Sequence, residues 1–247
     1  GLRVTDIGMV PTPLQYWAIQ HLNADGGVEI TGSHNPSDYN GFKISLQGTP
    51  FYGQDIQELY KLIVSEDYIE ASGTLDEQNL VDAYIDELSN NLHTAKRQLK
   101  VVIDAGNGTG GITAQTLYEK LGHHVIPLYC EPDGNFPNHH PDPTVEENLI
   151  DLKTKVIAEK ADLGIAFDGD ADRIGVVDAQ GEVIWGDKLM ILLSRALLKE
   201  ESGATILGEV KCSKALYDDI TAHGGRAIMW KTGHSLIKAK MKEEDAA

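Results

Sequence analysis

The sequence is poor in cysteine, poor in basic residues and without long apolar runs. Cys130 and Cys212 are its two cysteines, and they show neither metal-site spacing nor a disulfide framework. No apolar run reaches the length of a membrane-spanning helix, and the start lacks the basic-then-apolar pattern of a secretion signal. Lys and Arg number 21 against 38 Asp and Glu, so the net charge is −17. This acidity argues against general binding to nucleic acids or anionic membranes, because both attract basic surfaces.

The remaining composition is that of ordinary globular domains. The chain has 247 residues, of which 41% are hydrophobic and 24% are charged. That length suits one large domain or two to three small ones, each able to bury a core. A cytoplasmic enzyme is the default expectation. Because the first residue is Gly1 and not an initiator Met, we expect a fragment or a processed chain.

The order of the predicted elements is that of an α/β protein. Strands are expected over 28–30, 42–46, 99–103, 125–129, 163–167, 174–177, 205–210 and 226–230. Helices are expected from Thr12 to Gly26-Gly27 and over 54–65, 80–92, 145–160, 187–199 and 214–223. Two more are expected, one after the glycines of 106–111 that ends at Leu121, and one that begins at about Ser235. A βαβ order implies parallel strands with helices on the sheet faces. We therefore expect consecutive three-layer α/β domains with mixed, largely parallel sheets, spanning 1–78, 79–181 and 182–247.

Three aspartates alternate with the two smallest residues in Asp168-Gly169-Asp170-Ala171-Asp172, and Arg173 follows directly. Apolar runs on both sides predict a strand, a loop and a second strand. Gly169 and Ala171 leave room for the backbone to curl until three carboxylates face one point, and a hard divalent cation would relieve their repulsion. An EF-hand loop needs Gly in place of Arg173 and Glu in place of Ala179, so Mg²⁺ is favoured over Ca²⁺. The alternative is a solvated acidic turn.

Ser33 is the second candidate functional position. It lies in a tight turn that follows an expected strand and ends at Pro36. Gly32 permits close backbone approach or a positive φ, and Pro36 stiffens the exit. Such a turn presents a hydroxyl from a rigid support, as a phosphoryl acceptor requires. His34 beside it could orient the hydroxyl or exchange protons. Taken alone, a serine in a turn more often serves only the turn.

Other polar loops are less specific. The order of glycines in 106–111 matches neither nucleotide-binding motif, so a tightly packed strand-to-helix turn is the preferred interpretation, although its helix N-terminus could hold an anion. Lys211 and the segment 231–234 follow expected strands, where ligands collect in open α/β sheets. Contact with phosphate or sugar and ordinary solvated loops both stay open there. The pairs His123-His124 and His139-His140 look like loop or surface pairs.

Three segments together resemble the α-D-phosphohexomutase family, specifically its bacterial phosphomannomutase/phosphoglucomutase type. They are Thr31-Gly32-Ser33-His34-Asn35-Pro36, Asp168-Gly169-Asp170-Ala171-Asp172-Arg173 and Lys231-Thr232-Gly233-His234, in this order along the chain. In that family the motif serine is phosphorylated and the three aspartates hold Mg²⁺. The enzyme passes its phosphoryl group to a hexose phosphate, and the other phosphate of the resulting bisphosphate returns to the serine.

The resemblance implies a role for each matching residue. It assigns Ser33, Asp168, Asp170 and Asp172 to the metal, with Ser33 as the phosphoserine. It assigns Ser33, His34, Arg173 and Lys43 to catalysis, and Lys43, in Asn40-Gly41-Phe42-Lys43, resembles an active-site lysine of the family. It assigns Lys211, Gly233 and His234 to the substrate.

The implied function is that of a Mg²⁺-dependent phosphohexomutase that interconverts the 1- and 6-phosphates of mannose or glucose, with a hexose 1,6-bisphosphate as activator. We expect hexose phosphates as partners, a cytoplasmic location and a monomeric complete protein. Full-length members carry a basic segment ahead of Gly1, and a sugar-recognising loop and a fourth domain after residue 247, so we expect the chain alone to be inactive. Two alternatives stay open: a metal-dependent sugar-phosphate phosphatase with an aspartate nucleophile, and a noncatalytic module that binds sugar phosphate or Mg²⁺.

Overall fold

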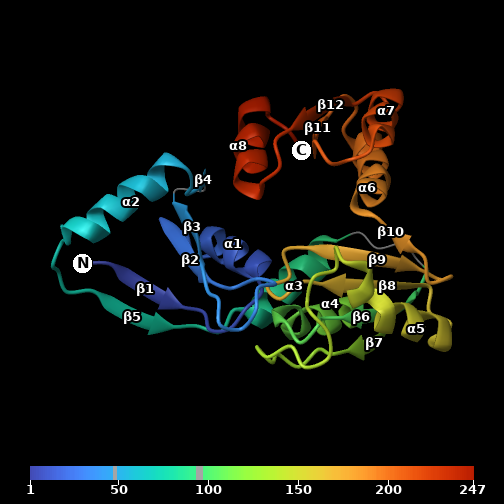
Figure 1. Ribbon diagram of the computed structural model, residues 1–247, viewed down its shortest axis with the longest axis horizontal. Coiled ribbons are helices and arrows are strands. Elements are labelled where there is room, and N and C mark those ends of the chain that lie inside the picture. The colour runs from blue at the N-terminus through green and yellow to red at the C-terminus, as the bar shows by residue number, and fades with distance from the viewer. Residues whose placement is uncertain (47–48, 93–96) are drawn as a thin grey trace. The chain divides into compact units, whose positions relative to one another are not determined.

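The computed structural model describes residues 1–46, 49–92 and 97–247, and it divides into two compact units (Figure 1). The first unit comprises Gly1–Gly48 and Gly53–Val183. The second comprises Thr49–Tyr52 and Ile184–Ala247. The expected division into three domains at residues 78 and 181 stays a prediction.

The first unit begins with two small sheets and two helices. Strand β1 (Arg3–Asp6) pairs in parallel with β5 (Thr74–Glu77), and β2 (Gly26–Ile30) pairs antiparallel with β3 (Phe42–Leu46). Helix α1 (Thr12–His21) begins at Thr12, as predicted, but Thr12 does not cap it: Pro11 is the N-cap residue, and the Thr12 hydroxyl bonds to Asp170. Helix α1 packs against β2, whereas α2 (Gln54–Ser65) buries none of its residues. Strand β5 was missed because it lies in a polar stretch that reads as a connector.

The predicted end of the first helix at Gly26-Gly27 is wrong. The helix stops at His21, and both glycines lie in β2. A Cβ on Gly27 would lie 2.2 Å from the side-chain nitrogen of Gln15 and 2.9 Å from Ile19. Gly27 therefore allows α1 to pack closely against β2, and it does not end the helix.

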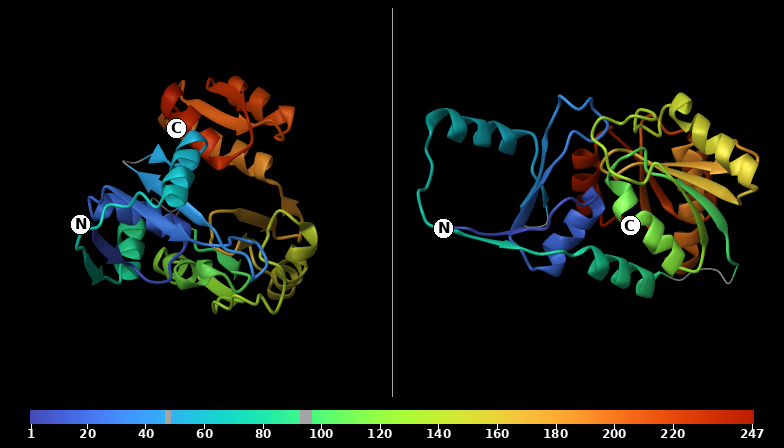
Figure 2. Two further views of the ribbon diagram at one scale, coloured as in Figure 1. Left: turned by 60° about the vertical axis from the view of Figure 1, so that its left-hand side comes forward. Right: turned by 90° about the horizontal axis from the view of Figure 1, so that it is seen from below.

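A five-stranded sheet follows in the first unit, in the order β10-β9-β8-β6-β7, and its last strand, β10, ends one residue into the second unit. Figure 2 shows its strands, coloured green to orange, from two further sides. Strand β6 is parallel to β7 and β8, and β8 is antiparallel to β9. The strands are β6 (Lys100–Asp104), β7 (His124–Leu128), β8 (Leu163–Phe167), β9 (Ile174–Asp178) and β10 (Val183–Ile184). The helices are α3 (Val81–Asn91), the 3-10 turn Thr109–Ile112 with α4 (Ala114–Lys120), and the 3-10 turn Glu146–Leu149 with α5 (Ile150–Glu159).

Alternate residues of β6 build two separate cores. Val102 packs with Leu152 and Val156 of α5, whereas Val101 and Ile103 pack with the α4 side. Because successive side chains of a strand point to opposite faces, helices cover both faces of this sheet. The predicted three-layer arrangement with a mixed, largely parallel sheet is confirmed.

The second unit repeats the α/β alternation. It contains α6 (Gly186–Glu200), β11 (Thr205–Glu209), α7 (Lys214–Ala222), β12 (Arg226–Trp230), α8 (His234–Glu244) and the short strand β4 (Thr49–Pro50). Strands β11 and β12 are parallel, and Ile206 packs there with Leu216 and Ile220 of α7. Among the described residues, the helices all fall short of the length and apolar character that a membrane span requires.

Candidate functional site

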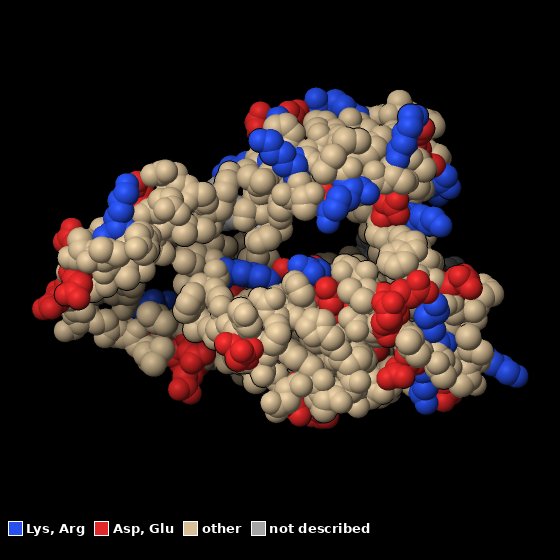
Figure 3. Space-filling model, viewed as in Figure 1, with Lys and Arg blue, Asp and Glu red and all other residues tan. Residues whose placement is uncertain are grey.

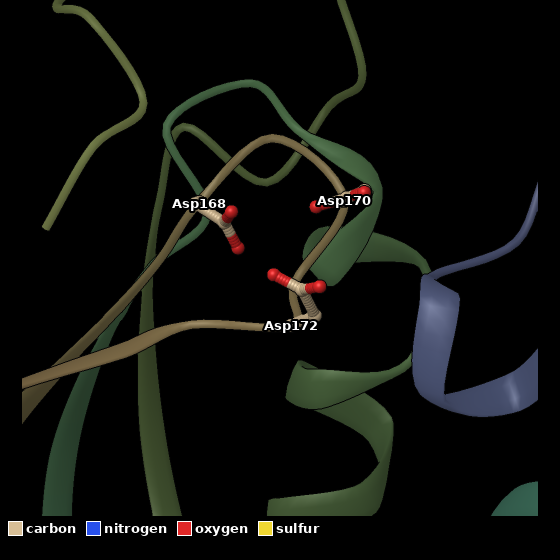
Figure 4. Close-up of side chains that lie close together, drawn as sticks. All are labelled: Asp168, Asp170 and Asp172. Atoms are coloured by element: carbon tan, nitrogen blue, oxygen red, sulfur yellow. The ribbon is translucent and has the colours of Figure 1, made fainter. Parts of the chain in front are cut away.

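The three aspartates converge at the tip of the β8–β9 hairpin. Phe167 pairs with Ile174, so the six residues between them form the connecting loop. One carboxylate oxygen from each of Asp168, Asp170 and Asp172 lies within 4.8 Å of the others, and Figure 4 shows all three side chains around one space. Ala171 adopts a positive φ of 57°, which produces the sharp curl. The loop thus gathers three oxygen ligands, the donor type that hard divalent cations prefer.

Ser33 lies against this loop although it is far away in the sequence. Its Oγ donates a hydrogen bond to Asp168 Oδ2 at 2.9 Å and lies 3.1 Å from His34 Nδ1. The positive φ falls on Ser33 itself, at 52°, and Thr31 Oγ1 accepts a hydrogen bond from its backbone N–H at 2.8 Å. Gly32 provides close approach, since a Cβ there would lie 2.9 Å from the Tyr39 carbonyl oxygen. The turn therefore aims the hydroxyl at the carboxylates.

Gly169 is the point at which the two loops touch. A Cβ on Gly169 would lie 2.1 Å from the carbonyl oxygen of Ser33, a distance that forces the backbone to move. On the other side, Thr109 N donates to Gly169 O at 2.9 Å. The segment 106–111, interpreted as a packed turn, thus also supports the aspartate loop.

We expect Gly169→Ala to lower the free energy of unfolding by about 1–3 kcal/mol, the usual cost of forcing extra volume into a packed contact. Urea unfolding measures this loss. Gly134→Ala is the matched control, because a Cβ at Gly134 meets nothing within 4 Å. If the two variants unfold within about 0.5 kcal/mol of each other, the tight Ser33–Gly169 contact does not exist in solution.

Lys43 reaches the same carboxylates from β3. Its Nζ donates hydrogen bonds to Asp170 Oδ2 at 2.5 Å and to Asp172 Oδ2 at 2.6 Å. Burial alone lowers the pKa of Lys43, but the bonds to Asp170 and Asp172 raise it above its ordinary value. Thr12 and Thr31 also donate to Asp170 Oδ2, at 3.1 and 3.0 Å. The single charge of the ammonium group is therefore shared between two of the three aspartates, and it offsets part of the negative charge of the cluster.

The electrostatics of the cluster fit a bound cation. Burial, followed by the charges of Asp170 and Asp172, raises the pKa of Asp168 to about 7, against hydrogen bonds from Arg173 and Ser33. Burial also acts to raise the pKa of Asp170, but Lys43 and the two threonines hold it below its usual range. Asp170 Oδ1 is buried and has no hydrogen-bond partner among the described residues. A buried carboxylate oxygen without a donor, beside two more carboxylates, is suited to coordinate a metal ion.

Arg173 lies on the rim of the cluster. Its backbone N–H donates to Asp168 Oδ1 at 2.9 Å, and its guanidinium lies 3.8 Å from both Asp168 and Asp142. Burial alone raises the pKa of Asp142, but hydrogen bonds from Thr144 and the charges of His34 and Arg173 lower it. Sequence reasoning missed Asp142. The signal was its place between Pro141 and Pro143, which stiffen the loop on both sides.

A second residue of this loop differs from its sequence interpretation. His139 does lie in a loop, but its side chain turns inward, is 14% exposed and bonds to the fully buried Asp104 at 3.0 Å. It is therefore not a surface residue. His140, its neighbour, is exposed, and its ring lies edge-on to that of His34 with 6.4 Å between the ring centres.

The residues expected to bind substrate belong to the second unit. Lys211 follows β11, is 70% exposed and lies 3.2 Å from Glu209. Gly233, with a φ of 131°, precedes α8, which begins at His234. Both positions lie just beyond the carboxyl ends of the parallel strands β11 and β12, the edge where ligands bind in open α/β sheets. Their assignment to the substrate stays a prediction.

Charge is divided unequally between the two units. The second unit has ten basic and nine acidic residues, so the whole of the net charge of −17 falls on the first unit. Figure 3 shows several groups of Asp and Glu side chains over the first unit, with some Lys and Arg between them, and side chains of both signs on the second unit. At the aspartate cluster, an anionic ligand would therefore depend on the neighbouring cations Lys43 and Arg173.

The fold and this site define an α/β protein in which a serine hydroxyl faces a carboxylate cluster suited to a hard cation. Three family models match the chain in succession. Residues 1–70 match domain I of phosphoglucomutase/phosphomannomutase, residues 82–181 match domain II and residues 185–247 match domain III, each described as alpha/beta/alpha. The chain belongs to the phosphoglucomutase/phosphomannomutase family, as its motifs predicted.

Individual relatives agree with this assignment. A phosphomannomutase/phosphoglucomutase of Pseudomonas aeruginosa is 50% identical over 246 residues, which cover 100% of this chain and 53% of the relative. A phosphoglucomutase of Neisseria gonorrhoeae is 45% identical, with 100% and 54% covered. The crystal structure of a phosphoglucomutase/phosphomannomutase family protein from Burkholderia thailandensis superimposes with a TM-score of 0.92 at 42% identity, covering 99% of this chain and 55% of that one. The chain thus spans about half the length of the curated relatives it matches.

Proposed function

We propose that the chain belongs to a Mg²⁺-dependent phosphohexomutase that interconverts the 1- and 6-phosphates of mannose or glucose through a phosphoserine and a hexose 1,6-bisphosphate. One observation carries the proposal: the Ser33 hydroxyl bonds at 2.9 Å to Asp168, within a cluster of three aspartates. The names of the relatives, phosphomannomutase and phosphoglucomutase, support the reaction class.

The chemistry assigned to Ser33 is transfer in both directions. When the phosphoserine reacts, its bond from Oγ to phosphorus breaks and a substrate hydroxyl oxygen bonds to the phosphorus. The proton of that hydroxyl ends on Ser33 Oγ, which becomes a free hydroxyl again. When the phosphate returns, Ser33 Oγ bonds to the phosphorus and the bond from phosphorus to the sugar oxygen breaks. The serine proton ends on that sugar oxygen, and His34 Nδ1, 3.1 Å from Oγ, is available to carry it.

The charges around Ser33 would stabilise the phosphoryl group during its transfer. Mg²⁺, held by Asp168, Asp170, Asp172 and the phosphorylated Ser33, would supply positive charge to the phosphoryl oxygens. Lys43 and Arg173 add fixed cations on the rim of the same space. Lys211, Gly233 and His234 are proposed to hold the sugar phosphate.

Four finer assignments stay predictions. They are activation by a hexose 1,6-bisphosphate, a monomeric complete protein, a cytoplasmic location and the inactivity of these 247 residues alone.

The test is to incubate the complete gene product with Mg²⁺ and hexose 1,6-bisphosphate carrying radioactive phosphate, and to map the labelled residue. We expect label on Ser33, stable to hydroxylamine because a serine phosphate is an ester. Ser33→Gly should take up none, whereas Ser37→Ala, a change in the same loop, should label normally. Hydroxylamine-labile label on an aspartate with release of free phosphate would favour the phosphatase. Binding of the sugar phosphate without any labelling would favour the noncatalytic module.

A further inference from the structure

The loop 138–142 forms one wall beside the serine site. His140 places its ring edge-on to that of His34, and Asp142 lies 3.8 Å from the Arg173 guanidinium. His34 in turn lies within hydrogen-bond distance of the Ser33 hydroxyl. What fixes this loop therefore also fixes the surroundings of the serine.

The loop is anchored to the end of β6 by two side chains. Asn138 donates to Asn107 Oδ1 at 2.7 Å, and His139 Nε2 lies 3.1 and 3.0 Å from the two carboxylate oxygens of Asp104. Asp104 is fully buried, and its Oδ1 also accepts a hydrogen bond from Gly106 N at 2.9 Å. The carboxylate thus has a fixed orientation on the rigid edge of the central sheet.

Both ring nitrogens of His139 face oxygen acceptors. Nε2 faces the carboxylate of Asp104, and Nδ1 lies 3.0 Å from the backbone carbonyl oxygen of His140. A carboxylate and a carbonyl can only accept, so a neutral imidazole with one N–H would leave a lone pair pointing at an oxygen atom. The doubly protonated imidazolium satisfies both contacts and forms an ion pair with Asp104.

We propose that the Asp104–His139 ion pair is a positioning pair for phosphoryl transfer. The charged imidazolium holds Asp104 with one N–H and the His140 carbonyl with the other, and so keeps the His140 ring against His34. Loss of one proton from His139 removes the second hydrogen bond and releases the His140 segment. The ion pair stands on its own geometry, whereas its effect on catalysis rests on the proposed function.

The surroundings of His139 favour its charged form. Burial alone lowers the pKa of His139, but the hydrogen bond and charge of Asp104, followed by the His140 carbonyl and the charge of Asp151, raise it above its ordinary value of 6.5. Tyr129 packs its ring 5.5 Å from that of His139 and donates its hydroxyl hydrogen bond to Asp151 at 2.9 Å. Because the pKa is raised in the folded state, the stabilisation is complete below 6.5 and is lost as the pH rises through the folded value.

The first test follows the histidine nitrogens by NMR in the chain labelled with ¹⁵N-histidine. We expect both His139 nitrogens to be protonated at pH 6.5, a midpoint above 6.5, and a shift of the His34 signals with that same midpoint. Asp104→Asn should move the midpoint of His139 downward. The proposal is overturned if only one His139 nitrogen is protonated at pH 6.5, or if the His34 signals do not change as His139 titrates. Either result holds whether or not the protein is a mutase.

The second test measures single-turnover transfer from phosphorylated Ser33 in the complete gene product. His139→Gln keeps one donor toward Asp104 but removes the charge and the second donor. We expect its rate to fall about 10- to 100-fold, as for a reacting group displaced by about 1 Å. Its Mg²⁺ affinity should stay within twofold, and the fall in the wild-type rate through the His139 midpoint should disappear.

His223→Gln is the control for the rate measurement, because His223 forms the same kind of pair with Asp219 at 3.2 Å but is exposed and lies in the second unit. It should leave both the rate and the pH profile unchanged. An unchanged rate and an unchanged pH profile in His139→Gln would overturn the positioning role. If His139→Gln does not fold, Asp104→Asn serves in its place, with the same expected loss and the same reading of an unchanged profile.

Discussion

Replacing Ser33 with Gly should reduce the proposed phosphohexomutase turnover of the complete gene product at least about 10³-fold, because the substitution removes the atom that we propose carries the phosphoryl group. Gly is a better probe than Ala here. Ser33 has a φ of 52°, where an alanine is strained and a glycine is not, so Ser33→Ala confounds lost chemistry with a displaced turn. A coupled assay of the conversion between the 1- and 6-phosphates, run with Mg²⁺ and a hexose 1,6-bisphosphate, measures the loss.

The control for Ser33→Gly is a titration of Mg²⁺, because the three aspartates are unchanged and the variant should still bind the ion. Ser37→Ala should retain turnover within about twofold, since Ser37 lies in the exposed part of the same loop. Turnover of Ser33→Gly above about one tenth of the wild-type value would mean that the phosphoryl group is carried elsewhere.

Asp172→Asn should weaken Mg²⁺ binding at least about 100-fold, since the loss of an outer partner of a metal ligand already costs about 10- to 100-fold. Replacing Asp170 would not separate the loss of a metal ligand from a change in the fold. Asp170 is buried and accepts hydrogen bonds from Thr12, Thr31 and Lys43, so its removal also disturbs the packing of two loops. Asp172 is exposed, and the amide of Asn preserves its shape.

Titration calorimetry measures the Mg²⁺ affinity of Asp172→Asn, and urea unfolding checks that the free energy of unfolding stays within about 1 kcal/mol of the wild-type value. Asp76→Asn is the control for charge alone, because Asp76 is exposed on β5 and far along the chain from the cluster. Equal weakening in both variants would show that only the net charge matters. Unchanged binding in Asp172→Asn would remove Asp172 from the ligand set.

The features that could be predicted from the sequence are those specified by residues that lie close together along the chain. The strand–loop–strand arrangement around Asp170 could be predicted because the apolar runs and the alternating aspartates lie within 15 residues, 163–177. The start of α1 could be predicted because Thr12 and Pro13 form a local start signal. The three motifs of the family likewise identified the family from short segments.

The parts that escaped it depend on partners far away along the chain or on weak patterns. The pair formed by Asp104 and His139 joins residues 35 apart with no periodic pattern between them. Gly27 reads as a helix terminator until the side chain of Gln15 is seen against it. Strand β5 is exposed along its whole length, so it lacks the buried alternation by which strands are recognised.

The bond from Ser33 to Asp168 joins residues 135 positions apart, whereas the three aspartates all lie in one hairpin loop. These two halves of the site therefore have different folding requirements. The hairpin needs only β8 and β9 to pair, which is a local event with a small entropy cost of loop closure. Ser33 can contact Asp168 only after the part of the first unit that holds β2 and β3 has packed against the part that holds the five-stranded sheet. A partly folded chain can hold its carboxylates together without presenting the serine to them. The proposed ability to accept phosphate would consequently be a property of the finished tertiary structure, whereas the proposed ligand set is a property of a single supersecondary element.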